Sequence, residues 1–131
     1  MNRTLVKMFA AVVALSASVP VLAHHSGAMF DDMKEVTVTG VVKNFQYTNP
    51  HSWLIVDVKE TDGTVTTWGF EAEGPSTMVR AGIRKSDFEA GTPVTVTGHP
   101  MRDGRPAAAW MKATRLTDKK EFVPLRGFAV R

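Results

Sequence analysis

The chain of 131 residues has the length of a single domain, contains no cysteine, and carries 16 basic and 13 acidic side chains. The absence of cysteine excludes a disulfide framework and thiolate zinc sites, so an apolar core must hold the fold together. Arg3 and Lys7 belong to the N-terminal leader, which leaves 14 basic residues against 13 acidic ones in the rest of the chain. Such a nearly neutral domain argues against a nucleic acid as the partner.

The first 23 residues have the three parts of a secretory signal peptide. A basic start without acids leads into an apolar run over residues 8–17, and small residues stand just before and at Ala23. The apolar run is shorter than the roughly 20 residues that a membrane-spanning helix needs. The sequence therefore predicts export to the periplasm, cleavage after Ala23, and a mature chain that begins at His24 and has no membrane span.

Five stretches after the leader have the β-branched and alternating composition of strands. They cover residues 36–47, 52–59, 64–71, 94–98 and 107–116. Gly40 interrupts the first stretch and predicts a bulge or a tight bend there. Pro75 and Gly82 predict the start and the end of a short helix between the third and fourth strands.

Three strands, a short helix and two further strands follow the order of the five-stranded OB barrel, an all-β fold. The expected organisation is a signal peptide over 1–23, an N-terminal segment over 24–34, an OB-like barrel over 35–116 and a tail over 117–131. A generic antiparallel sandwich is the alternative, because strand order alone does not exclude it.

Five short motifs carry a resemblance to a known family. They are Ala-His-His-Ser at 23–26, Met-Phe-Asp at 29–31, Thr-Asn-Pro-His-Ser-Trp at 48–53, Trp-Gly-Phe-Glu at 68–71 and Val-Thr-Val-Thr-Gly-His-Pro at 94–100. From the leader boundary to about Leu116, the chain resembles domain of unknown function 6152, a family of small exported proteobacterial proteins. The resemblance implies export and a small β domain, and it implies no activity.

All four histidines lie in the predicted mature chain: His24, His25, His51 and His99. The α-amine and the imidazole of His24 can chelate one metal ion, and a second imidazole would complete a set of three nitrogens that suits Cu(II). Cleavage one residue earlier would place His25 third in the chain, which also makes a square-planar copper or nickel site. A polar chain start without a metal is the alternative.

The OB topology suggests which histidine would be the second ligand. The loops between strands 1–2 and 4–5 flank the ligand-binding face of this fold; His51 lies in the first loop and His99 opens the second. Because the fourth strand runs antiparallel to the first, His99 should lie where the N-terminal segment enters the barrel. We therefore expect His24 and His99 as copper ligands, with His25 and His51 as further candidates. An ordinary turn role is the alternative for His51 and His99.

Trp53 and Trp68 lie on the second and third strands, on which OB proteins stack their ligands, and core packing is the alternative for both. Glu71 and Glu73 share one side of the third strand near its end, and we expect solvated charges there rather than an acid–base pair. The sequence thus predicts a binding protein rather than an enzyme. Its ligand would be a metal ion, copper first. The alternative is a metal-free module that binds a small ligand or a protein through strands 2 and 3.

Overall fold

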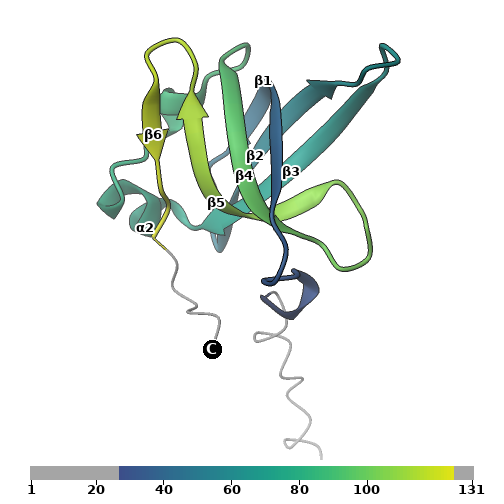
Figure 1. The fold of residues 1–131 in the computed structure, drawn as a ribbon. Helices are drawn as coiled ribbons and strands as arrows, with labels where there is room; N and C mark the ends of the chain where they lie inside the picture. The colour runs from purple at the N-terminus through teal and green to yellow at the C-terminus, as the bar shows by residue number, and fades with distance from the viewer. Residues whose placement is uncertain (1–26, 126–131) are drawn as a thin grey trace, which may run out of the picture.

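The alternating stretches form strands close to their predicted ranges. The computed structural model describes residues 27–125 (Figure 1). Its elements are η1 (Gly27–Met29), β1 (Val36–Gln46), β2 (His51–Lys59), β3 (Val65–Glu73), α2 (Pro75–Arg80), η2 (Lys85–Phe88), β4 (Pro93–Pro100), β5 (Ala107–Arg115) and β6 (Lys120–Phe122). Gly63, in the turn between β2 and β3, and Gly104, in the loop between β4 and β5, have φ values of 88° and 80°, a region that favours glycine.

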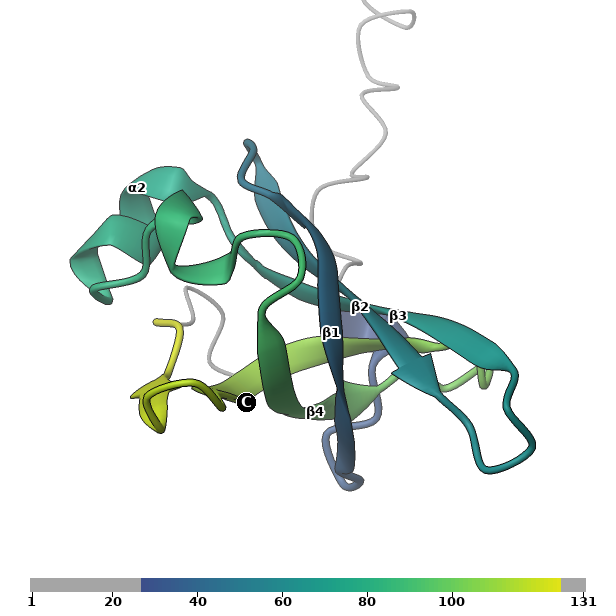
Figure 2. The ribbon, with the colours of Figure 1, turned by 90° about the horizontal axis from the view of Figure 1, so that it is seen from above.

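The sheet closes on itself as the sequence predicts. The strand order is β3-β2-β1-β4-β5-β6, and a parallel pairing between β3 and β5 completes a five-stranded barrel. The short helix α2 follows β3, which confirms the OB-like barrel with a helix between strands 3 and 4. Figure 2 shows the tip of the β2–β3 hairpin and α2 at opposite ends of the barrel.

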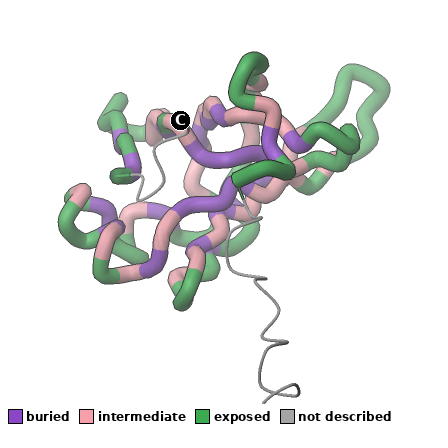
Figure 3. The backbone as a smooth tube through the Cα atoms, turned by 90° about the horizontal axis from the view of Figure 1, so that it is seen from below, coloured by how far each residue is buried: buried purple, intermediate pink, exposed green. Residues whose placement is uncertain are grey.

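The barrel interior is filled by one side of each strand, because successive side chains of a strand point to opposite faces. Buried and less buried residues consequently alternate along the strands, while the loops are exposed (Figure 3). The helical connection after β3 contributes Met78, Ile83 and Phe88 to the same core. Phe88 packs edge-on against Phe45 and Trp110, with ring centroids 5.5 and 5.4 Å apart.

Gly40 has a role that differs from the expected bulge. A bulge was one of the two features predicted at Gly40, but the register of β1 against β2 shifts further along, between Val42 and Asn44. At Gly40 itself, a Cβ atom would collide with the backbone carbonyl of Asp57 on β2. Glycine is therefore required at this position by the close approach of the two strands rather than by a bulge.

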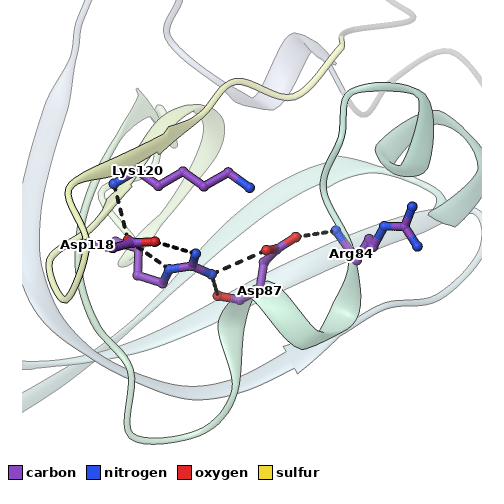
Figure 4. A network of polar contacts seen from close by, with 5 residues as sticks. Arg84, Asp87, Asp118 and Lys120 are labelled. Carbon is purple, nitrogen blue, oxygen red and sulfur yellow. Dashed lines mark hydrogen bonds and ion pairs between the residues drawn. The ribbon is translucent and has the colours of Figure 1, made fainter.

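The tail contains a sixth strand that the sequence did not predict, since only Phe122 of β6 is apolar and buried. Arg115 at the end of β5 donates two hydrogen bonds to the Asp118 carboxylate, at 3.0 and 2.7 Å, and one to the Asp87 carbonyl oxygen, at 3.0 Å. Figure 4 shows this network, in which Asp87 also accepts a hydrogen bond from the backbone N–H of Arg84. The network ties η2 to the turn between β5 and β6.

Candidate functional site

The described residues before β1 lie on the outside of the barrel, next to the end of β4. Figure 1 shows η1 below the start of β1, near the β4–β5 loop. Phe30 forms an antiparallel bridge with Met101, and its side chain is 5% exposed. Phe30, Met101 and Ala109 make a small apolar cluster of their own, separate from the barrel core.

Backbone hydrogen bonds fix the same segment on both sides of this bridge. Asp31 N–H donates to the Pro100 carbonyl at 2.8 Å, and Arg102 N–H donates to the Met29 carbonyl at 2.9 Å. The Arg102 guanidinium adds a bond of 3.2 Å to the Ala28 carbonyl. The chain that leads from the N-terminus is thus held against the end of β4.

His99 lies on the outer face of β4, beside this segment. The neighbouring residues Thr95 and Thr97 also lie on this outer face, where their hydroxyls form hydrogen bonds with threonines of β1. Gly98, between Thr97 and His99, lies on the inner face and pairs with Val36. Nδ1 of His99 lies 2.7 Å from the carbonyl oxygen of Lys34. A carbonyl can only accept, so Nδ1 carries the hydrogen and Nε2 of the neutral ring carries the lone pair. Of the two ring nitrogens, Nε2 is therefore the one with a lone pair available to a ligand.

His51 begins β2 and lies on the outer face of the barrel. Its Nδ1 is 3.0 Å from Oε1 of Glu71, so the ring contacts a carboxylate. The Glu71 side chain is only 7% exposed, and burial raises its pKa; Glu73 raises it further and His51 lowers it. The expectation of solvated charges is therefore wrong for Glu71, which is a buried carboxylate, while Glu73 is half-buried.

The two candidate tryptophans lie on opposite faces of the sheet. Trp53 pairs with Glu71 on the outer face, where its ring covers Gly69; a Cβ added to Gly69 would lie 3.2 Å from the ring. Trp68 pairs with Val56, packs against the core, and stacks on Phe70 with ring centroids 6.0 Å apart. Of the pair, only Trp53 belongs to the outer surface around His51.

The structure does not bring His51 and His99 together. His51 lies on β2 and His99 on β4, with β3 and β5 between them on the closed side of the barrel. Three strand spacings correspond to about 14 Å along the sheet. Among residues 27–125, no three His, Cys, Asp or Glu side chains form a group able to hold a metal ion. The other candidates, His24 and His25, lie outside the described residues.

Sequence reasoning missed Phe30 and Arg102 as parts of this region. Phe30 stands within the Met-Phe-Asp motif at 29–31, which is the one signal that singled it out. A lone phenylalanine outside any alternating stretch gives no indication of its partner. Here the partner is 71 positions away, in the β4–β5 connection.

The fold and this outer surface define a small OB-like β-barrel whose N-terminal segment is docked beside a histidine. The chain matches a family model described as "Family of unknown function (DUF6152)" over residues 11–110. The chain belongs to this family. No curated protein matches the chain. Within the described part, no helix is long and apolar enough to cross a membrane.

Proposed function

We propose that the mature protein is an exported binding protein that holds a transition-metal ion, copper in the first place, with its N-terminus and His99. The α-amine and the imidazole of His24 would supply two nitrogens, and Nε2 of His99 would supply the third. One observation carries the proposal: His99 stands beside the docked N-terminal segment, with Nδ1 bonded to the Lys34 carbonyl. Metal-binding histidines typically donate their other ring nitrogen to an oxygen in this way.

The reach of the chain supports the same pairing. Strand spacing and rise put the Cα atoms of Phe30 and His99 about 8 Å apart, because Phe30 bridges Met101, two residues after His99 and just past the end of β4. His24 lies three positions before Gly27, and a chain of that length spans at most about 11 Å. A metal between His24 and His99 is therefore compatible with the docked segment. His51 lies beyond β5 and β3, which makes it the weaker partner.

Export is a condition of this site, since signal peptide cleavage after Ala23 creates the free α-amine at His24. The unperturbed pKa of an α-amine, about 7.7–8.0, allows it to bind a metal near neutral pH. Mass analysis of the protein recovered from the periplasm tests this part. We expect a chain that begins at His24, and a mature chain that starts downstream of His25 would contradict the proposal.

A Cu(II) titration followed by EPR tests the metal site in mature protein that begins at His24. We expect one equivalent of copper with several nitrogen ligands. One extra residue before His24 should weaken binding because it removes the amine chelate, and His99→Ala should remove one nitrogen. His51→Ala is the matched control and should leave the spectrum unchanged. An identical weak signal in all four proteins would rule out the site.

A metal-free binding function of the β2–β3 face is the second candidate, and the arrangement of Trp53 over Gly69 next to the buried Glu71 favours it. An aromatic ring beside a carboxylate is suited to a small ligand or to a side chain of a protein partner. If the copper titration is negative, ligand-induced changes in the fluorescence of Trp53 would be the next measurement. Trp53→Phe should abolish such changes, and signals that persist in this variant would locate the ligand elsewhere.

A further inference from the structure

The contacts that dock the N-terminal segment are not needed to close the barrel. The barrel is complete with β1 to β5, and its core cluster contains neither Phe30 nor Met101. Yet Phe30 is as deeply buried as a core residue, in the separate cluster with Met101 and Ala109. We call the docked residues 28–31, together with Met101 and Arg102, the N-terminal latch.

The latch combines apolar burial with directional backbone bonds. Burial of the phenylalanine side chain removes a large apolar surface from water, which favours the docked position of this short segment. The two backbone hydrogen bonds, from Asp31 to Pro100 and from Arg102 to Met29, set the register of that segment along β4. The ion pair of Arg102 with Asp31, 3.7 Å long with an Arg102 side chain 56% exposed, adds little by comparison.

We infer that the latch is a positioning device for the metal site, which fixes the new N-terminus at a short tether beside His99. This inference rests on the function proposed above. It assigns positioning roles to Phe30 and Arg102, which carry no metal-binding nitrogen of their own at this site. The latch also gives residues 28–31, which lie outside the barrel, a function besides connecting the N-terminus to β1.

The size of the effect follows from the length of free chain. With the latch closed, the fixed point at Gly27 lies three positions after His24. With the latch open, the nearest fixed point is Lys34, whose carbonyl is bonded to His99, ten positions after His24. The effective concentration of a tethered group falls with about the −3/2 power of tether length, so a roughly three-fold longer tether lowers it roughly six-fold.

The test is Phe30→Ala in mature protein that begins at His24. We expect copper affinity to fall roughly six-fold, with the same number of nitrogen ligands by EPR, because the ligands themselves are intact. Hydrogen exchange at the amides of Asp31 and Arg102 should accelerate, which reports opening of the latch without any metal. Phe30→Leu should restore most of both properties. Arg102→Ala, a second variant, should lower affinity by a smaller factor.

Phe122→Ala is the matched control, because Phe122 is equally buried but belongs to the barrel core. It should lower the thermal midpoint and leave the copper affinity of the folded protein unchanged. If Phe30→Ala accelerates exchange while copper affinity stays within two-fold, the inference is wrong and the proposed function stands. If the unchanged mature protein binds no copper, the proposed function fails, and the inference fails with it.

Discussion

Gly98, next to His99 on β4, offers the sharpest test of the packing that supports the site. A Cβ added to Gly98 would lie 2.5 Å from the carbonyl oxygen of Ala109 and 2.9 Å from the Cβ of Ala108, both on β5. The first contact is with backbone, which cannot rotate away. In Gly98→Ala, β4 and β5 must therefore separate by several tenths of an ångström, directly beside His99 on β4.

The expected cost can be assembled from three contributions. Overpacking costs about 1–3 kcal/mol, and weakening two inter-strand hydrogen bonds adds about 1 kcal/mol for each bond. The lower backbone entropy of unfolded alanine returns about 0.5–1 kcal/mol. We expect Gly98→Ala to lower the free energy of unfolding by about 2–4.5 kcal/mol. The control, Gly27→Ala, has open space around the added atom and should change stability by less than about 0.5 kcal/mol.

Urea unfolding followed by tryptophan fluorescence measures both variants. A loss of this size should lower the midpoint by about 1–3 M urea with an unchanged slope. A midpoint for Gly98→Ala within the error of the Gly27→Ala midpoint would refute the reasoning. It would mean that the two strands can separate at no cost, and that the position of His99 is not fixed by the barrel.

Three further predictions concern the core and the charged groups. Phe88→Ala should cost about 3–5 kcal/mol in urea unfolding, because Phe88 is fully buried among aromatic rings, whereas Val79→Ala on the exposed side of α2 should cost little. Burial raises the pKa of Glu71 above 4.5, so the wild type loses stability as the pH rises through this raised pKa. The stability of Glu71→Gln relative to wild type should therefore rise from pH 4 to pH 8 in thermal unfolding. A difference that falls with pH would contradict the burial of a charged carboxylate. Hydrogen bonds from Arg115 lower the pKa of Asp118 to about 2. The stabilising effect of the Asp118 carboxylate is therefore complete above pH 3.8 and is lost as the pH falls towards 2. Asp118→Asn should be less stable than wild type at pH 7 and equal to it near pH 2, and a difference independent of pH would argue against the ion pair.

The barrel could be predicted because each of its strands and turns is defined by residues that are close together in the sequence. Alternation of apolar and polar residues defines five strands, Asp-Gly pairs mark two turns, and Pro75 and Gly82 bound the helical connection. The order of these elements then leaves few topologies, of which the OB barrel is one. The sixth strand escaped prediction because three residues with one apolar side chain carry no period. β6 forms through its pairing with β5 and the hydrogen bonds of Arg115.

Glu71 shows why the site itself was harder to predict. The alternation along β3 correctly puts Glu71 on the side opposite the buried Phe70, and an outward carboxylate is normally solvated. On this barrel, however, the outer face at Glu71 is covered, because β5 lies beside it and His51 contacts it. Burial of an outward side chain depends on elements distant in sequence, which a strand pattern does not contain.

The two proposed functions use different surfaces of the barrel, one around His99 and one around His51, and the position of the N-terminus distinguishes them. His51 and His99 lie about three strand spacings apart on the closed side of the barrel, about 14 Å along the sheet, so one ion with short nitrogen bonds is not expected to use both. The latch docks the entering chain at the end of β4, next to His99 and away from β2. A copper site, if present, should therefore respond to His99 and to Phe30 but not to His51. A response to His51 alone would move the site to the surface of Trp53 and Glu71, and would leave the docked segment with a purely structural role.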